Sequence, residues 1–257
     1  MLALPATALA SSASRRPSSG GSGLTPSGAP AAQSPVAVPV AGDGNVTVSA
    51  QGNGIAFATR ASTMLRRRLS FAGTAPPGLV GDEIEIERSG HETHWRWTAT
   101  VSAKIAADGS FSATWHTNHI GRFAIRAVIS SAADGPIASP AASGNDNPAL
   151  TPGATASPPL TVIVYRRSRA TEFGPGFWGQ RTACGQRLRR WMIGVANRTL
   201  PCGTKVAIYY RGRTLVVPVI DRGPYANGAD WDLTMATGRA LGIDGTVELG
   251  AVSLPRR

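Results

Sequence analysis

Asp221 is the acidic side chain of this sequence whose position best suits proton transfer. It ends an apolar run, residues 214–220, and is followed by Arg222, Gly223 and Pro224. Because Gly and Pro mark a sharp turn, we expect this acid at the point where a strand ends and a loop begins. Partial burial there would raise its pKa toward the range useful for acid–base chemistry. The alternative is a structural carboxylate that caps the Gly223 turn or pairs with Arg222.

Asp232 is the best candidate for a second carboxyl group that acts beside Asp221. It lies in Trp231-Asp232-Leu233-Thr234, just before the one helical pattern of this region, Met235 to Leu241. Thr234 suits the N-cap of that helix and Gly242 its C-terminal end. The alternative for Asp232 is hydrogen bonding to backbone donors at the helix start. The remaining carboxylates after residue 165 are Glu172, Asp230, Asp244 and Glu248.

The chain has two cysteines, Cys184 and Cys202, eighteen positions apart in turn-forming segments. An even number of cysteines in a chain that carries export-like features favours a disulfide over two free buried thiols. A catalytic cysteine is disfavoured, because no histidine follows residue 119.

The four histidines form two pairs, His91 with His94 and His116 with His119. Two such pairs can in principle bind zinc. In a strand, however, residues i and i+3 point to opposite faces. We therefore expect surface histidines, and we expect neither a metal nor a cofactor.

The C-terminal third has the pattern of a small barrel. Glycines and prolines separate short runs rich in Val, Ile and Tyr, and Arg211-Gly212-Arg213 has the form of a tight hairpin turn. The expected strands are Met192 to Ala196, Lys205 to Tyr210, Thr214 to Ile220 and Thr246 to Val252.

The N-terminal segment has export-like features. Residues 1–10, MLALPATALA, resemble the remnant of a signal peptide whose start codon is assigned too late. The alternative is an ordinary disordered terminus. No cysteine follows this run, so we expect no lipid anchor, and no apolar run approaches the ~20 residues of a membrane span. Residues 11–43 are rich in Ser, Gly, Pro and Ala, which predicts a disordered tether.

Residues 45–165 predict an immunoglobulin-like β-sandwich, because seven short strand patterns are separated by turns. Trp95, Trp97 and Phe123 are the expected core aromatics, and the insert Ala132 to Pro159 is expected to be a long loop. The expected strands are Asn45 to Ser49, Met64 to Gly73, Asp82 to Glu87, Trp95 to Ile105, Ser110 to Thr114, Gly121 to Ile129 and Leu160 to Tyr165.

The charge is concentrated toward the C-terminus. After Tyr165 there are fifteen Lys or Arg against six Asp or Glu, which is +9 of the formal net charge of +11. A basic surface attracts polyanions. The aromatic–basic pattern of a nucleic-acid module is missing, so we expect an anionic cell-wall polymer rather than nucleic acid. Solvated surface arginines are the alternative.

Three blocks of the C-terminal third occur in a characteristic order: FGPGFWGQRTACGQ, ANRTLPCGTKV and VVPVIDRGPYANGADWDLT. Over about residues 170–254 they resemble the rare lipoprotein A (RlpA) family, whose barrel acts on bacterial cell-wall glycan. The resemblance implies a six-stranded double-psi β-barrel with a short helix at residues 168–255. With the sandwich, the expected fold class is all-β.

The family's glycan cleft, as the resemblance implies it, combines the Asp at position 221 with a Glu, an Asp and a His. This chain has Gln186, Arg189 and Asn197 at those three positions. Amide side chains can form hydrogen bonds with sugar hydroxyls, but they do not transfer protons near neutral pH. The expected substrate-binding residues are Gln186, Arg189, Asn197, Arg222, Tyr225, Asp232 and Trp178, and Trp191 is a further candidate for stacking on sugar rings.

These substitutions leave alternatives open. We expect a secreted, cell-wall-associated protein that binds peptidoglycan glycan, with Asp221 as the catalytic residue if it cleaves glycan by lytic transglycosylation. One alternative is a non-catalytic, expansin-like module that binds polysaccharide. Another is a disulfide-stabilised barrel that binds a protein partner.

Overall fold

The computed structural model describes residues 46–129, 154–226 and 228–255, and most of its regular structure is β-strand. The expected signal remnant at residues 1–10, the tether at residues 11–43 and most of the insert at residues 132–159 lie outside the described residues. Three short 3-10 helices connect strands: η1 (Pro77–Leu79), η2 (His91–Thr93) and η3 (Pro175–Phe177).

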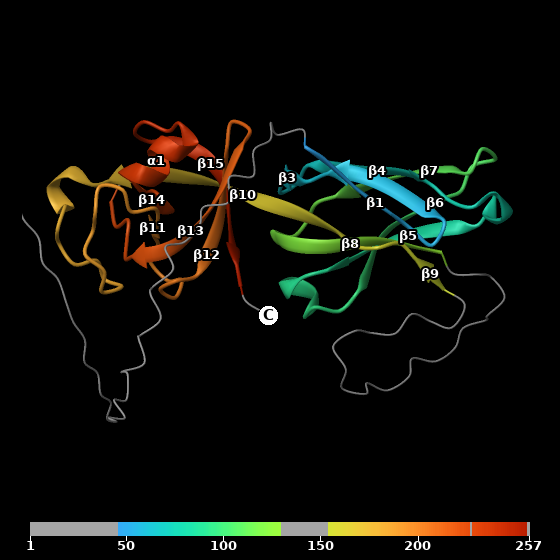
Figure 1. The fold of residues 1–257 in the computed structure, drawn as a ribbon, viewed down its shortest axis with the longest axis horizontal. Helices are drawn as coiled ribbons and strands as arrows, with labels where there is room; N and C mark the ends of the chain where they lie inside the picture. Colours follow the sequence, from blue (N-terminus) through green and yellow to red (C-terminus); the bar gives the residue numbers. More distant parts are fainter. Residues whose placement is uncertain (1–45, 130–153, 227, 256–257) are drawn as a thin grey trace, which may run out of the picture. The chain divides into compact units, whose positions relative to one another are not determined.

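Residues 46–129 form a β-sandwich together with the first part of β10 (Figure 1). One sheet has the order β1-β2-β4-β7, and the other contains β10-β8-β5-β6 with β9 beside β8 and β3 beside β10. The strands of the first sheet are β1 (Thr47–Gly52), β2 (Ile55–Arg60), β4 (Arg68–Thr74) and β7 (Ser110–His116). Those of the second are β3 (Ser62–Met64), β5 (Glu83–Ser89), β6 (Thr98–Lys104), β8 (Gly121–Ile129), β9 (Thr155–Ala156) and β10 (Leu160–Phe173).

The aromatic core of the sandwich differs from the prediction. Phe123 is buried as expected, and its partner is Trp115, whose ring meets it edge-on with centroids 5.6 Å apart. Trp95 and Trp97 are only half-buried, so their prediction as core residues was wrong. Trp97 instead makes a cation–π contact with Arg126, whose guanidinium lies over the ring, 4.2 Å from its centroid.

Strand β10 belongs to both folds. Its first residues pair with β8 and β3, and residues 166–173 pair with β15 and β14 (Figure 1). The prediction ended this strand at Tyr165, and the interval expected between sandwich and barrel falls inside it. Tyr165 is 1% exposed, because both parts pack around this point of the strand.

The C-terminal third closes into a six-stranded barrel, which confirms the expected fold class. The order is β14-β11-β13-β12-β15-β10, and a parallel β10–β14 pairing completes the circle. Val206, Val217, Val219 and Leu233 fill the interior with no exposed surface. The strands besides β10 are β11 (Val195–Ala196), β12 (Lys205–Tyr210), β13 (Arg213–Asp221), β14 (Trp231–Thr234) and β15 (Val247–Leu254).

Helix α1 (Met235–Leu241) has the predicted ends. The Thr234 hydroxyl accepts from the Thr237 N–H (3.2 Å), and Gly242 closes the helix at φ 72°. The Thr237 hydroxyl also exchanges two hydrogen bonds of 2.9 Å with the backbone of Gly194, just before β11. The helix thereby fixes the short strand on which the site is built.

Cys184 and Cys202 are joined in a disulfide, as the sequence predicted. The bond ties the loop before β11 to the loop before β12. Replacing both cysteines with Ser should lower the free energy of unfolding by about 3 kcal/mol, because the bond restricts the unfolded chain. Denaturant unfolding of the variant and of the oxidised protein measures the difference. Equal stabilities would show that the bond does not stabilise the fold.

Candidate active site

The two aspartates singled out in the sequence lie on either side of one short strand. Ala196 of β11 pairs with Asp221 of β13 and with Asp232 of β14. A register irregularity at Val195–Ala196 aligns Asp221 with Ala196. With neighbouring strands ~4.8 Å apart, two strand spacings place the Cα atoms of the two aspartates about 10 Å apart. The alanine between them adds only a methyl group.

Backbone donors fix the carboxylate of Asp221. Its Oδ1 accepts the N–H of Ala183 (2.8 Å) and the N–H of Arg222 (2.8 Å). Ala183 belongs to a tight loop that the Thr182 N–H closes by donating to the Gln186 carbonyl (2.7 Å). The half-buried Asp221 therefore orients the loop that carries Gln186. Both bonds go to Oδ1, and no side chain or backbone group among the described residues bonds to its Oδ2.

The surroundings of Asp232 perturb its carboxyl group. Burial raises its pKa above the usual value, and the negative charges of Asp221 and Glu172 add to that rise. The Thr171 hydroxyl donates to its Oδ1 (2.8 Å), which acts in the opposite direction. A carboxyl group in this setting holds its proton more readily than an exposed one, as a general acid must.

Sequence reasoning missed Thr171 and Glu172. The parallel β10–β14 pairing aligns Thr171 with Asp232, sixty-one positions further along the chain. Glu172 accepts the Gly245 N–H at Oε2 (2.7 Å), so its charge is fixed near the site. Only knowledge of the strand pairing could have revealed these neighbours, since no local pattern marks them.

Asn197 and Arg222 shape the loops next to the carboxylates. Asn197 Oδ1 accepts the N–H groups of Thr199 (3.1 Å) and Leu200 (2.9 Å), which organises the turn after β11. Arg222 donates to the Asn197 carbonyl (3.4 Å). An amide oxygen that accepts two backbone N–H groups is a turn-forming group, so a structural use accounts for Asn197 at this position.

The other predicted binding residues differ in exposure. Gln186 and Arg189 are exposed, and Gln186 accepts a long hydrogen bond from the Thr182 hydroxyl (3.5 Å). Tyr225 and Trp191 expose 79% and 73% of their surfaces, so both rings are free to stack on a ligand. Trp178 is half-buried and packs on the apolar cluster around Ala196. Phe177, which was not predicted, is 55% exposed.

Within residues 46–129, 154–226 and 228–255, no three His, Cys, Asp or Glu side chains converge in a way that could hold a metal ion. The helices of the same residues include none that is long and apolar enough to cross a membrane.

Comparison with known proteins places the barrel in a defined class. The family model described as "Lytic transglycolase" matches residues 168–252. These residues form an RlpA-like double-psi β-barrel, which confirms the resemblance read from the three sequence blocks.

Three curated relatives carry this barrel. The chain is 43% identical over 85 residues to the probable endolytic peptidoglycan transglycosylase RlpA of Synechocystis, covering 32% of this chain and 26% of the relative. It is 37% identical over 91 residues to that of Aquifex aeolicus, covering 34% and 40%. It is 38% identical over 77 residues to the endolytic peptidoglycan transglycosylase RlpA of Campylobacter jejuni, covering 29% and 27%.

The chain thus spans between about a quarter and two fifths of the length of these relatives. A solved structure, Streptomyces papain inhibitor, aligns with 35% of this chain and 93% of its own at 24% identity, with a TM-score of 0.29. At this score the likeness supports no argument about function.

Proposed function

We propose that the barrel binds the glycan strands of peptidoglycan and cleaves them by lytic transglycosylation at the cell wall. The observation that carries the proposal is the pair of carboxyl groups, Asp221 and Asp232, on either side of Ala196. The names of the relatives that share this barrel support the choice of peptidoglycan.

The reaction needs one proton donor and one group that stabilises positive charge at the anomeric carbon. Asp232 is suited to the first role, because burial raises the pKa of its carboxyl group above the usual value. It donates this proton to the glycosidic oxygen as the C–O bond breaks. The muramyl 6-hydroxyl then attacks the anomeric carbon of its own sugar and gives its proton to the Asp232 carboxylate, so the group is regenerated and no water is consumed.

Asp221 is suited to the second role. Two backbone N–H groups fix its carboxylate, so no reorganisation is needed as charge develops. This division assigns to Asp232 the proton transfer that the sequence alone assigned to Asp221. This division of roles does not depend on the three substituted family positions, because none of Gln186, Arg189 and Asn197 has to carry a proton.

The test is to incubate the full chain with peptide-free glycan strands and to analyse the products by mass spectrometry. We expect 1,6-anhydromuramyl ends. New reducing ends with added water would indicate a hydrolase instead. Binding without any product would support the alternative of a polysaccharide-binding module, and the transglycosylase proposal would be withdrawn.

A further inference from the structure

A second feature of the molecule lies around the turn between β3 and β4 and along β10, β12 and β15. Two neighbouring hollows share Met64, Arg66, Arg67 and Tyr209 in their walls. Their linings together contain six arginines and a single carboxylate, Glu248. We call these six the arginine cluster: Arg60, Arg66, Arg67, Arg68, Arg167 and Arg211.

The charges of this cluster are largely uncompensated. Among the described residues, its only ion pair is Arg167 with Glu248 (3.6 Å), and both side chains are mostly exposed. Arg68 donates to His116 Nε2 (3.1 Å), which is an uncharged acceptor in that role. Like charges gathered without counter-ions repel one another, and an anionic ligand would relieve that repulsion.

The turn that carries three of the arginines is rigidly built. Thr117 is 2% exposed, and its hydroxyl donates to the Met64 carbonyl (2.9 Å) and to the Arg67 carbonyl (3.0 Å). The backbone N–H of Arg67 returns a bond to the same hydroxyl (3.1 Å). Strand β3 in turn pairs with β10 from Ser62 to Met64. The arginines are therefore presented on a fixed frame rather than on a loose loop.

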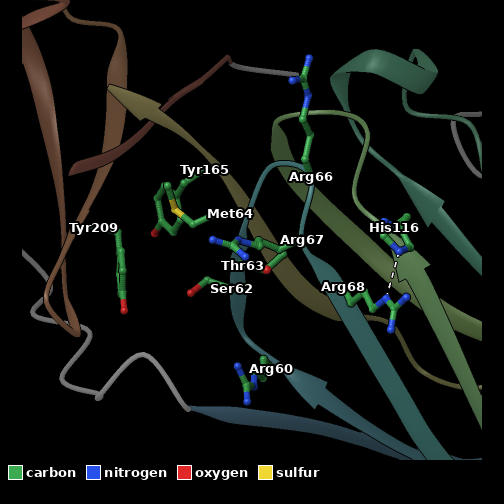
Figure 2. Close-up of a pocket in the computed structure, with 10 residues that line it drawn as sticks. All are labelled: Arg60, Ser62, Thr63, Met64, Arg66, Arg67, Arg68, His116, Tyr165 and Tyr209. Carbon is green, nitrogen blue, oxygen red and sulfur yellow. Dashed lines mark hydrogen bonds between the residues drawn. The ribbon is translucent and has the colours of Figure 1, made fainter. Parts of the chain in front are cut away.

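Arg66 occupies an unfavourable backbone conformation. Its φ is 63°, in the left-handed region that glycine or asparagine adopts more easily. A long cationic side chain at such a position points to a use for that side chain. In Figure 2, Arg67 lies among Ser62, Thr63 and Met64, whereas Arg66 extends away from the other labelled residues. The turn thus presents charge in several directions.

We propose that the arginine cluster binds a linear phosphodiester polymer of the cell wall, such as a chain of glycerol phosphate units. Each guanidinium can bind the two free oxygens of a phosphate as a fork. Because the six cations are spread over two hollows, a chain with repeated charges fits them better than one small anion does. The hydroxyls of Ser62 and Thr63 add donors beside the guanidinium groups.

Nucleic acid is the less suitable polyanion. Binding of single strands relies on aromatic faces that stack on bases. Tyr209 stacks on Tyr165 with centroids 5.6 Å apart, and Arg211 covers the ring of Tyr210 at 5.2 Å. The aromatic faces around the cluster are thus already occupied on at least one side.

This site is separate from the carboxylates of the candidate active site. The arginines of the cluster come from β2, β4, β10 and the turns after β3 and β12, whereas Asp221 and Asp232 lie on β13 and β14. The proposal therefore does not require the barrel to be catalytic, and each can fail without the other.

The experiment measures binding of a fluorescent glycerol phosphate oligomer to the full chain near physiological salt. Arg66→Gln, Arg67→Gln and Arg68→Gln together should weaken binding roughly 10- to 100-fold, because each lost contact is a charge-assisted hydrogen bond. The matched control replaces Arg96, Lys104 and Arg190 with Gln, which removes the same charge at exposed positions elsewhere. We expect less than about a threefold change for the control, since distant charges are screened.

A second variant guards against loss of the turn. Replacing the same three arginines with Lys keeps the charge, and thermal unfolding checks its fold. It should bind at an intermediate level, because Lys does not form the fork. Equal losses in the cluster and control variants would overturn the proposal, as would wild-type affinity in the Lys variant or no binding by the wild type. Tighter binding of an oligothymidine or of polyglutamate of equal charge would also overturn it, in favour of another class of polyanion.

Discussion

Replacing Asp232 with Asn is expected to lower glycan cleavage by roughly 10²- to 10⁴-fold, the range attributed to a general acid. Asn keeps the volume and an oxygen that accepts from the Thr171 hydroxyl, but it has no proton to give. The readout is the rate of appearance of 1,6-anhydromuramyl ends. Asp244→Asn is the matched control, because Asp244 is exposed and lies outside the strands that carry Asp221 and Asp232; it should cleave like the wild type.

The same variant should be more stable than the wild type at neutral pH. Burial raises the pKa of Asp232 in the folded protein above its value in the unfolded chain, so the folded state binds more protons between the two values. Stability therefore falls as the pH rises through that window, and the loss is complete above the folded pKa. Asn removes this loss.

Melting temperatures across pH test this expectation. The gain of Asp232→Asn should be present at pH 7 and should vanish below the ordinary Asp pKa of about 3.9. A carboxyl group that is merely structural would give the reverse, with lower stability in the variant at pH 7. Full cleavage by Asp232→Asn would remove Asp232 from the mechanism.

The barrel could be predicted because glycines and prolines, which favour turns, separate its strands in the sequence. Arg211 and Gly212 have φ values of 45° and 85°, as the hairpin turn between β12 and β13 requires. The largest excess was at β11, whose expected start at Met192 is instead a turn in which the Met192 N–H donates to the Arg189 carbonyl.

The sandwich was predicted less completely. Strand β2 was missed, although Ile55, Phe57 and Thr59 are buried in strict alternation, so the signal was present. The expected strand from Met64 to Gly73 is broken into β3 and β4 by the left-handed turn at Arg66. That break depends on the buried Thr117 fifty positions away, which no local pattern reveals.

The candidate site, too, could be predicted only in part. Asp221 could be singled out because it follows an apolar run and precedes Gly and Pro. Its position relative to Asp232 depends on β11, which pairs with both β13 and β14. Glu172 lies near the site because β10, which carries it, pairs with β14. Local patterns mark candidate acids, but the distribution of proton and charge between them depends on pairings that are distant in sequence.

Asp221 should behave differently from Asp232 when it is changed. Asp221→Ala leaves the N–H groups of Ala183 and Arg222 without their shared acceptor, so we expect a loss of about 1–2 kcal/mol in the free energy of unfolding. Asp221→Asn should lose less, because its amide oxygen can still accept. Cleavage should fall about 10²-fold or more in both, since neither variant has a charge at this position.

Asp230→Asn provides the matched control for Asp221, because Asp230 also accepts a backbone N–H, from Arg169 (3.1 Å), but lies outside the Asp232–Ala196–Asp221 row. It should lose a similar amount of stability and keep its cleavage. Urea unfolding and anhydromuramyl product analysis measure the two effects separately. If Asp221→Asn keeps cleavage within about threefold of the wild type while losing stability as Asp230→Asn does, Asp221 serves only to hold the Ala183 loop, because a carboxylate that stabilises the transition state cannot lose its charge without slowing the reaction.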